Sequence, residues 1–526
     1  MIMIDKTIYK RVLAVDCNYK WLPIEPLPPN QALSSGTFRP PPLDGSLTLP
    51  EIYDWHLEHS PEHQLFVYTD SFGIEHEVNW RDGARGIFNV SREIRRRVRL
   101  PANRIGSPPT VVAILSTADT FTYFMVISGI IRSGYTVFPI SPRNSPSAVA
   151  HFLRKVSVTH IILGEDEAIV DLYSDSLKIL DDGPALQIKT SMMLDFENIF
   201  QNLHDASPPN LEVAFDLDCL ALIIHSSGTT AFPKLVPYTH YKALQLSCTP
   251  YFGEQDMCGL SPKAIITSAK LTRSELVFCI STHVEAWSKD EECMEFLSST
   301  RGILYGGGLL YQKHGDALSE KGISIHIIYG CSEIGLMSPT ILKNPAGKDW
   351  NYFQIASNIN GKFISDDLGN FELVIVPDRY KTPCVFNTEL DGVYGYATGD
   401  LLTPHPTKPN HWKIWGRIDD QITHSTREKT NPAPLEMIVN QDSCIRAAVI
   451  FGHGRLHIGI IVEPASGHKF DPSDTRKLNE FRDKIWPSIE EMNEQAPKHS
   501  RIHKEYLLVA SPTKPFLYTA KNTACS

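Results

Sequence analysis

The stretch LALIIHSSGTTAFPK, residues 220–234, joins an apolar run to a loop of hydroxyl residues, one glycine and one lysine. A short apolar run bounded by turn residues is typical of a buried strand. The loop can direct hydroxyls, backbone N–H groups and an ammonium toward one polyanion, which is the chemistry of phosphate binding. It lacks the G-x-x-x-x-G-K-[ST] pattern of a Walker A motif. By itself it also fits an ordinary surface turn, so the segments around it must decide.

Apolar runs and helix-like segments alternate on both sides of this stretch. Strands are predicted at residues 111–115, 136–140, 160–163, 302–305 and 324–328, and helices at 49–59, 120–132 and 145–155. This alternation predicts a parallel sheet with helices on its faces. The segment from Phe371 to about Trp415 is strand-like and rich in turn residues, which indicates an antiparallel sheet. After Arg417 a smaller section has predicted strands at 447–451 and 458–462 and a polar helix at 474–485.

The composition bounds the class of protein. With 526 residues, 42% hydrophobic and 21% charged, the chain is long enough for two to four globular domains. A net charge of −10 gives no electrostatic reason to bind nucleic acid or an anionic membrane. The ten cysteines are scattered without a C-x-x-C pattern, which favours free thiols in a reducing compartment. No signal-peptide pattern or membrane span is predicted, so we expect a cytoplasmic location.

Four further segments have residue types suited to one nucleotide, although each alone also fits a simple turn or cap. Tyr329-Gly330-Cys331-Ser332-Glu333 follows an apolar run, at the strand end where parallel sheets bind ligands. Gly306-Gly307-Gly308 follows another strand and lets a flat ring approach the backbone. The carboxylate of Asp400, after a tight turn, can accept two hydrogen bonds from a ribose diol. Gly416-Arg417-Ile418-Asp419-Asp420 stands where the large section gives way to the small one.

Together with Lys521 near the end of the chain, these segments resemble the adenylate-forming superfamily. It contains acyl-CoA synthetases, luciferases and the adenylation domains of nonribosomal peptide synthetases. The resemblance extends from about Leu49 to Lys521. The runs at residues 137–146 and 428–432 look like those of fungal nonribosomal-peptide-synthetase-like enzymes, in which an adenylation domain precedes a carrier domain and a release domain.

The resemblance implies a role for each segment. Ser226, Ser227, Gly228, Thr229, Thr230 and Lys234 would hold the β- and γ-phosphates of ATP. Gly306, Gly307, Gly308 and Tyr329 would flank the adenine. Ser332 would contact the α-phosphate and Glu333 would bind Mg²⁺. Asp400 and Arg417 would fix the ribose, and Asp419 would be the hinge of a mobile small domain. Lys521 would lie between the acid's carboxylate and the α-phosphate, where a cation screens two anions that must meet.

The chain also departs from the family pattern. The Phe-His-x-x-Gly segment that lines the acyl pocket is not found between His240 and Tyr329, and some tens of residues are missing there. Ala231, Arg427 and Asn522 stand where the family has glycine. Arg427 could obstruct the path of a pantetheine arm, the carrier of the second half-reaction. The predicted domains are therefore a proline-rich leader (1–48), a large subdomain shortened at about 245–285 (49–416) and a small subdomain (417–526).

Three interpretations stay open at this point. The first is an enzyme that uses ATP and Mg²⁺ to convert a carboxylic acid to acyl-AMP and pyrophosphate, with a thioester on a carrier protein or CoA as the possible next product. The second is a catalytically impaired relative that binds a nucleotide or a partner only. The third is a stand-alone acyl-CoA ligase. The sequence names neither the acid nor the oligomeric state, and it leaves open whether the missing segment reflects the gene model.

Overall fold

The computed structural model describes residues 24–33, 35–69, 74–181, 187–203, 216–225, 234–252, 275–340, 347–366, 368–516 and 518. Its contacts divide the chain into two compact units. The first unit comprises residues 1–226, 232–362 and 375–396, and the second comprises 227–231, 363–374 and 397–526. The predicted domain boundary between residues 416 and 417 stays a prediction.

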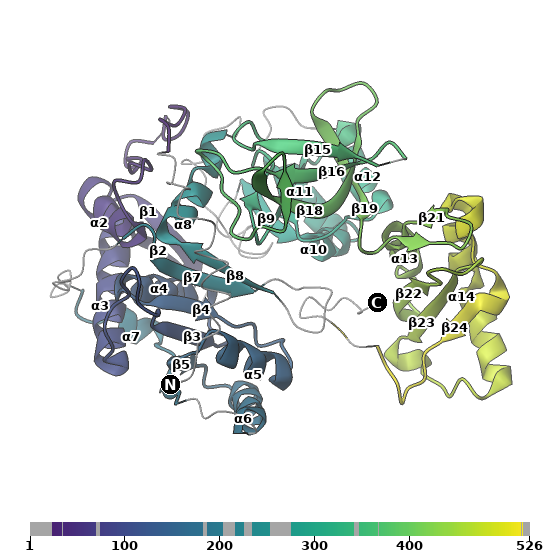
Figure 1. The fold of residues 1–526 in the computed structure, drawn as a ribbon, viewed down its shortest axis with the longest axis horizontal. Helices are drawn as coiled ribbons and strands as arrows, with labels where there is room; N and C mark the ends of the chain where they lie inside the picture. Colours follow the sequence, from purple (N-terminus) through teal and green to yellow (C-terminus); the bar gives the residue numbers. More distant parts are fainter. Residues whose placement is uncertain are drawn as a thin grey trace. The chain divides into compact units, whose positions relative to one another are not determined.

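A six-stranded sheet organises the first part of the first unit (Figure 1). Its strand order is β6 (Lys189–Met192), β5 (His160–Leu163), β3 (Val111–Leu115), β4 (Thr136–Pro139), β7 (Leu220–His225) and β8 (Leu235–Thr239). The first five strands are parallel, and β8 pairs antiparallel with β7. The predicted α/β fold with mostly parallel strands is therefore confirmed.

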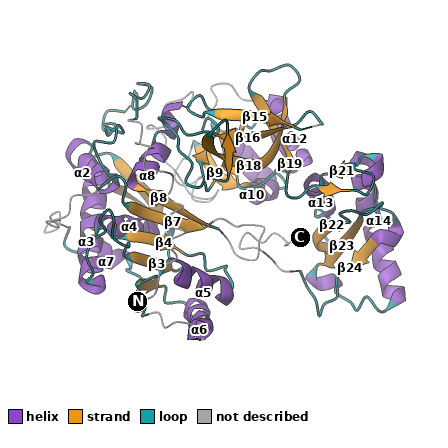
Figure 2. Ribbon diagram, in the orientation of Figure 1, coloured by secondary structure: helices purple, strands orange, loops and turns teal. Residues whose placement is uncertain are grey.

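Alternating side chains of these strands enter two separate cores, one on each face of the sheet. Val112, Ile114 and Val137 pack with α3 (Trp80–Val98), α4 (Thr120–Arg132) and α7 (Phe196–Phe200). Their neighbours Val111, Ala113 and Phe138 pack with α5 (Pro146–Lys155) and α6 (Glu167–Asp181) on the other face. Figure 2 shows these helices on both sides of the strands. Because both faces of the sheet are covered, successive residues of a strand such as β3 are all buried and apolar, and the strand is a continuous apolar run in the sequence.

Local signals set the helix boundaries. The carboxylate of Asp119 accepts hydrogen bonds from the backbone N–H of Phe121 (3.0 Å) and Thr122 (2.9 Å), so α4 begins at Thr120. Helices α2 (Leu49–His59) and α4 have the predicted bounds. The remaining elements of this part are a hairpin of β1 (Gln64–Thr69) and β2 (Glu75–Asn79), helix α8 (His240–Ser247) and the short η2 (Thr249–Phe252).

A second, three-stranded parallel sheet follows within the first unit. Its order is β11 (Ile325–Ile327), β10 (Gly302–Gly306) and β9 (Leu276–Ile280), and the helices beside it are α10 (Ser281–Trp287), α11 (Glu291–Ser298) and α12 (Gln312–Glu320). The short elements of this part are β12 (Gly330–Cys331), β13 (Gly335–Leu336), η3 (Gly347–Asp349), β14 (Phe353–Gln354) and β17 (Thr388–Leu390).

The second unit contains antiparallel strands and a small α+β part. Strands β18 (Val393–Pro404) and β19 (His411–Arg417) pair antiparallel, and β15 (Gly361–Ser365) and β16 (Phe371–Ile375) belong to the same sheet. Of these strands, residues 363–374 and those from Ala397 onward are assigned to the second unit. The hairpin of β20 (Ile422–Thr423) and β21 (Lys429–Thr430) precedes a sheet of β22 (Ile445–Phe451), β23 (Gly459–Pro464) and β24 (Leu507–Val509). The helices of this part are α13 (Pro432–Val439) and α14 (Thr475–Gln495). Its single turns are η4 (Ser466–His468), η5 (Lys498–Ser500) and η6 (Lys504–Tyr506).

Helix α14 is longer than predicted. The sequence predicted an end at Ile485, whereas the helix continues through Pro487 to Gln495. The buried side chains Ile489 and Met492 continue the apolar face of the helix, so burial compensates the proline. None of the described helices is both long and apolar enough to cross a bilayer. The cysteines in the described part of the chain are free thiols: Cys219, Cys248, Cys279, Cys293, Cys331, Cys384 and Cys444.

Candidate functional site

The second parallel sheet brings two of the predicted segments together. Strands β10 and β11 run side by side with Tyr305 opposite Ile327, and the N–H of Ile328 donates to the carbonyl of Tyr305 (2.7 Å). The glycines after β10 therefore lie beside the Tyr329 segment after β11. A Cβ atom on Gly306 would lie 2.9 Å from the carbonyl oxygen of Ile328. This glycine is thus required by the neighbouring strand whether or not a ring binds above it.

Tyr329 is buried and stacks on Phe353, with ring centroids 4.5 Å apart and an interplanar angle of 27°. Its backbone N–H donates to Ser338 Oγ (2.9 Å), and its carbonyl accepts from Met337 N–H (2.8 Å). One face of the phenol ring is therefore covered by Phe353. The predicted contact of Tyr329 with an adenine stays a prediction.

Ser332 and Glu333 occupy the turn of a hairpin that we call the motif hairpin, formed by β12 and β13. In this hairpin Gly330 pairs with Leu336 and Cys331 with Gly335. Its backbone is fixed from outside: Tyr238 donates its hydroxyl to the carbonyl of Ser332, and Cys384 donates its N–H to the carbonyl of Glu333 (2.7 Å). Two predicted site residues are thereby held at a defined place beside the carboxyl ends of β10 and β11.

Glu333 is 8% exposed as a whole residue, and its carboxylate forms no hydrogen bond or ion pair with the described residues. A carboxylate in a mostly covered residue, without a partner among the described residues, suits a cation that arrives with a ligand. Mg²⁺ usually takes one or two protein carboxylates and completes its shell with water and phosphate oxygens. The described residues form no larger cluster of His, Cys, Asp and Glu that could hold a metal alone. Glu333 therefore fits Mg²⁺ that is bound together with a phosphate ligand.

A buried lysine lies close to the motif hairpin. Lys381 is 1% exposed, and its Nζ has no hydrogen-bond partner among the described residues. A Cβ atom on Gly335 would lie 3.7 Å from this Nζ, so the amine touches the hairpin directly. Burial lowers the pKa of Lys381 from 10.5 to about 8, and the nearby Cys248, Cys384 and Asp378 oppose that shift. The amine is thus charged at neutral pH at a cost in stability.

The phosphate-type loop lies outside the described residues except for Lys234. Residues 226–233 are therefore untested as phosphate ligands. The strands that flank the loop are well defined, because His225 and Leu235 are register partners of the β7–β8 pair. Lys234 is exposed at the start of β8. Its contact with phosphates stays a prediction.

In the second unit, three predicted residues form one ion-pair network. Asp400 on β18 and Arg417 on β19 are register partners. Arg417 Nη1 lies 3.0 Å from Asp400 Oδ1, and Arg417 Nη2 lies 3.2 Å from Asp419 Oδ2. The proximity of Asp400, Arg417 and Asp419 is therefore a finding, whereas ribose binding and the hinge role of Asp419 stay predictions.

Gly399 permits this network. Its φ is +72°, and a Cβ atom there would lie 2.9 Å from Arg417 Nη2. Its N–H donates to Glu372 Oε1 (3.1 Å). Burial raises the pKa of Glu372, and the charges of Asp419 and Asp400 raise it further. Two carboxylates therefore pair with one guanidinium, and a neutral diol is an acceptable ligand because it adds hydrogen-bond donors without further charge.

Arg427 adopts a backbone conformation that favours glycine. Its φ is +76°, in a tight turn where Arg427 N–H donates to the carbonyl of His424 (3.0 Å). The side chain is exposed. The family's glycine at this position thus has a conformational reason, and arginine adopts the same geometry under strain.

The segment that leads to Lys521 is fastened to β23 by Glu463. This residue is 3% exposed, and its carboxylate accepts from Phe516 N–H (2.9 Å), from the Tyr518 hydroxyl (3.0 Å) and from Arg446 Nη1 (2.9 Å). The guanidinium of Arg446 lies over the ring of Tyr518, 4.2 Å from its centroid. Lys521 and Asn522 themselves lie outside the described residues, so the catalytic role of Lys521 stays a prediction.

The sequence analysis missed the residues that hold these segments in place. Tyr238, Lys381 and Cys384 come from two distant parts of the chain, and no local pattern links them to the motif hairpin. Glu463 directly follows the strand predicted at residues 458–462, where an acidic residue suggests an exposed position. Only a burial prediction for these positions could have drawn attention to them.

Sequence comparison identifies the family. The profile of the family described as "AMP-binding enzyme" matches residues 93–272, and that of the "AMP-binding enzyme C-terminal domain" matches residues 419–525. The chain belongs to the adenylate-forming superfamily. Adenylate-forming reductase Nps10 of Heterobasidion annosum is 40% identical over 553 residues, covering 95% of this chain and 50% of that protein. Adenylate-forming reductase Nps9 of Serpula lacrymans is 30% identical, covering 92% of this chain and 48% of that protein.

Members of the superfamily with known structures have the same fold. The A domain of carboxylic acid reductase from Segniliparus rugosus, solved with AMP and a co-purified carboxylic acid, matches with a TM-score of 0.63 and 12% identity, covering 91% of each chain. The adenylate-forming chain described here spans about half of the length of the curated relatives it matches. Its similarity to the fungal group, predicted from residues 137–146 and 428–432, is thereby confirmed.

Proposed function

We propose that this protein activates a carboxylic acid with ATP. The acid's carboxylate oxygen attacks the α-phosphorus of ATP, the bond from that phosphorus to the bridging oxygen breaks, and acyl-AMP and pyrophosphate form. The observation that carries the proposal is the carboxylate of Glu333, which has no partner among the described residues and is held on the hairpin that follows β11. Mg²⁺ bound there would neutralise phosphate charge while the chain holds the substrate in place.

Each part of the chain has a defined task in this proposal. Ser332 and Lys234 contact phosphate oxygens, and the Ser226–Thr230 loop completes that contact. Asp400 accepts the ribose hydroxyls, and Arg417, whose Nη1 lies 3.0 Å from Asp400 Oδ1, orients the carboxylate. Lys521 supplies a cation between the two reacting anions, since positioning and charge screening carry most of such a transfer. The acyl group would pass next to a thiol of a carrier protein or CoA.

A hydroxylamine assay tests the proposal. Hydroxylamine converts acyl-AMP to a hydroxamate, which is measured with ATP, Mg²⁺ and a panel of aryl, amino and keto acids. We expect Lys521→Ala to eliminate hydroxamate while ATP affinity changes little. Lys514→Ala is the matched control, because this exposed lysine lies in the same terminal segment. Equal hydroxamate from wild type and Lys521→Ala would refute the assigned role of Lys521.

One observation favours the alternative, an impaired relative that only binds nucleotide. Among the described strands, β9 is at the edge of its sheet, and it exposes Phe278 (47%) and Ile280 (50%) on one face. The match to Nps10 extends over 553 positions, more than the 526 residues of this chain, so that relative has residues with no counterpart here. ATP binding without hydroxamate from any acid of the panel would favour this alternative. Thioester formation with free CoA would instead favour a stand-alone ligase.

A further inference from the structure

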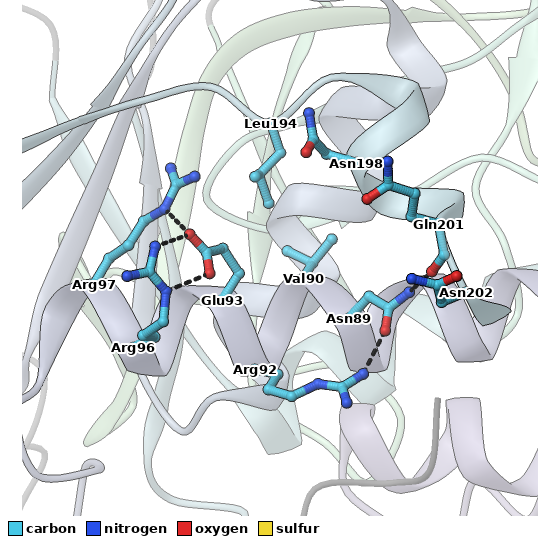
Figure 3. A pocket seen from close by; sticks show the side chains of 10 residues that line it. All are labelled: Asn89, Val90, Arg92, Glu93, Arg96, Arg97, Leu194, Asn198, Gln201 and Asn202. Carbon is cyan, nitrogen blue, oxygen red and sulfur yellow. Dashed lines mark hydrogen bonds and ion pairs between the residues drawn. The ribbon is translucent and has the colours of Figure 1, made fainter. Parts of the chain in front are cut away.

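A polar pocket of about 660 Å³ lies between α3 and the segment around α7, within the first unit (Figure 3). It shares no residue with the proposed nucleotide site. One wall is the C-terminal half of α3, which contributes Arg92, Arg96 and Arg97, and the opposite wall contributes Asn198 and Gln201. This volume lies in the range of pockets that bind small molecules.

The pocket is positively charged. Glu93 is the one carboxylate among its lining residues. Hydrogen bonds from Arg96 lower the pKa of Glu93 to about 2, with help from Arg97, so the group stays ionised. Three guanidiniums and one carboxylate leave two positive charges on a chain whose net charge is −10. A pocket of this sign attracts a dianion against the general field of the protein.

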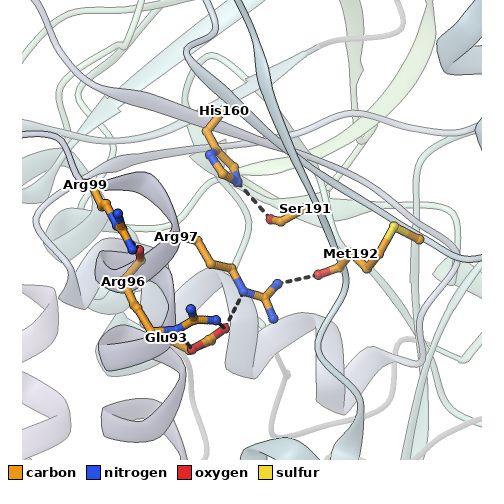
Figure 4. Close-up of polar contacts among 7 residues, drawn as sticks. All are labelled: Glu93, Arg96, Arg97, Arg99, His160, Ser191 and Met192. Atoms are coloured by element: carbon orange, nitrogen blue, oxygen red, sulfur yellow. Dashed lines mark hydrogen bonds and ion pairs between the residues drawn. The ribbon is translucent and has the colours of Figure 1, made fainter.

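The guanidiniums are held in place and still have free donors. Arg96 Nε and Nη2 each lie 2.7 Å from Glu93, and Arg97 donates from Nε to Glu93 (2.6 Å) and from Nη1 to the carbonyl of Met192 (2.6 Å), as Figure 4 shows. Arg96 Nη1 and Arg97 Nη2 have no hydrogen-bond partner among the described residues. Because Glu93 orients the guanidinium groups of Arg96 and Arg97, less side-chain entropy is lost when a ligand binds.

The two walls are also tied together. Asn89 Nδ2 donates to the carbonyls of Ile199 (3.1 Å) and Gln201 (2.9 Å), while its Oδ1 accepts from Arg92. The pocket is therefore a fixed depression rather than a gap between independent side chains. The carboxamides around it suit hydroxyl groups, and Val90 and Leu194 offer a small apolar surface.

We propose that this pocket binds a small phosphate-bearing molecule. A phosphate monoester has the charge and the tetrahedral oxygens that several fixed guanidinium forks recognise. The surrounding carboxamides would accept and donate to hydroxyls on the same ligand. An ion pair that serves the fold alone would need one arginine for Glu93, whereas the pocket has three.

Calorimetry with inorganic phosphate and with glycerol phosphate tests the proposal on the full chain. We expect binding with a dissociation constant of about 1 mM or below at low salt, and weaker binding as salt is added. The double variant Arg92→Ala/Arg96→Ala should weaken binding at least about tenfold, since two charge-assisted contacts are lost. Arg104→Ala/Arg143→Ala removes the same charge from two exposed arginines elsewhere and should leave affinity within about twofold.

A second measurement locates the ligand, because phosphate could also bind the proposed nucleotide site. Phenylglyoxal modifies free arginines, and peptide mass spectrometry reports the extent at each one. Glycerol phosphate should protect Arg92, Arg96 and Arg97 and leave Arg143 unprotected. Arg92→Lys/Arg96→Lys keeps the charge and should retain part of the affinity, which guards against a folding defect in the alanine variant. Unchanged labelling at the three arginines, or equal affinity of wild type and the alanine variant, would overturn the proposal.

Discussion

Glu333 and Glu463 are both buried glutamates, and they differ in what surrounds the carboxylate. Glu463, in the second unit, is 3% exposed and receives hydrogen bonds from three donors. Glu333, in the first unit, is 8% exposed, and its carboxylate receives none from the described residues. Burial of a charge is tolerated in a fold when its partners are present. The difference indicates that Glu463 serves the folded state, and it agrees with our proposal that Glu333 binds a cation together with the substrate.

The largest expected effect is that of Glu333→Gln on the rate of acyl-AMP formation. Glutamine keeps the shape and removes the charge, so we expect acyl-AMP formation to fall by about 10²–10³, the usual cost of a lost preorganised charge contact. Urea unfolding should show little loss of stability, because no contact of the carboxylate is broken. Hydroxamate formation and urea titrations on the same preparation measure both quantities. A variant with a normal rate would show that Glu333 binds no catalytic cation.

Lys381→Met sharpens the comparison by removing the other unpartnered charge near the motif hairpin. The folded pKa of Lys381 is about 8 and the ordinary value is 10.5, so burying the ammonium destabilises the fold at pH 7. We expect the variant to be more stable by about 3 kcal/mol at pH 7. This gap should shrink as the pH rises from 8 to 10.5, because wild type then loses the buried proton. Urea titrations across that range measure it, and a less stable variant would contradict the unpartnered state of the amine.

Glu463→Gln should act oppositely to Glu333→Gln. It breaks a charge-assisted pair with Arg446, so we expect a loss of about 2 kcal/mol in the unfolding free energy of the second unit at pH 7. Burial raises the pKa of Glu463, but hydrogen bonds from Phe516, Tyr518 and Arg446 outweigh it and lower the pKa. The stability contributed by ionised Glu463 is therefore complete above its unfolded pKa and declines as the pH falls below it. Wild type and variant should converge in acid, and a constant gap would contradict this assignment.

The smallest expected effect concerns backbone strain. Arg427→Gly should stabilise the protein by about 0.5–1 kcal/mol, because glycine adopts a φ of +76° without the strain that arginine has. Arg99, with a φ of 55° at the end of α3, is the matched position in the first unit, and Arg99→Gly should behave alike. If a thiol acceptor is used, Arg427→Gly should also speed thioester formation without changing adenylation. Equal thioester rates would remove Arg427 as an obstruction.

Much of the fold could be predicted because the parallel strands are continuous apolar runs. The helices at Leu49–His59 and Thr120–Arg132 were predicted with their observed bounds. Helix α3 was missed, since Gly83 and Gly86 interrupt it and weaken the helical signal. In the structure those glycines admit Leu65 and Met125, because a Cβ would lie 2.5 Å and 2.7 Å from these side chains. Tertiary packing thus explains residues that local propensity opposes.

Part of the candidate site could also be predicted, because it follows from the parallel arrangement of the strands. The meeting of Gly306 with the Tyr329 segment follows from the rule that carboxyl ends of parallel strands share an edge. The pairing of Asp400 with Arg417 is set by antiparallel register, which the sequence indicates only as a turn-rich run. The supports of the motif hairpin could not be predicted, since Tyr238 and Lys381 are separated by more than a hundred residues in the chain.

The attachment of Phe516 and Tyr518 to Glu463 limits how far the end of the chain can travel. Lys521 is the third residue after Tyr518, and a fully extended chain spans at most about 3.5 Å per residue, so the backbone between them spans about 10 Å at most. A longer excursion of Lys521 must therefore carry β23 with it. Movement of the Lys521 ammonium into and out of the site would then be a rigid-body movement, and its rate would be that of the folded segment that contains β23.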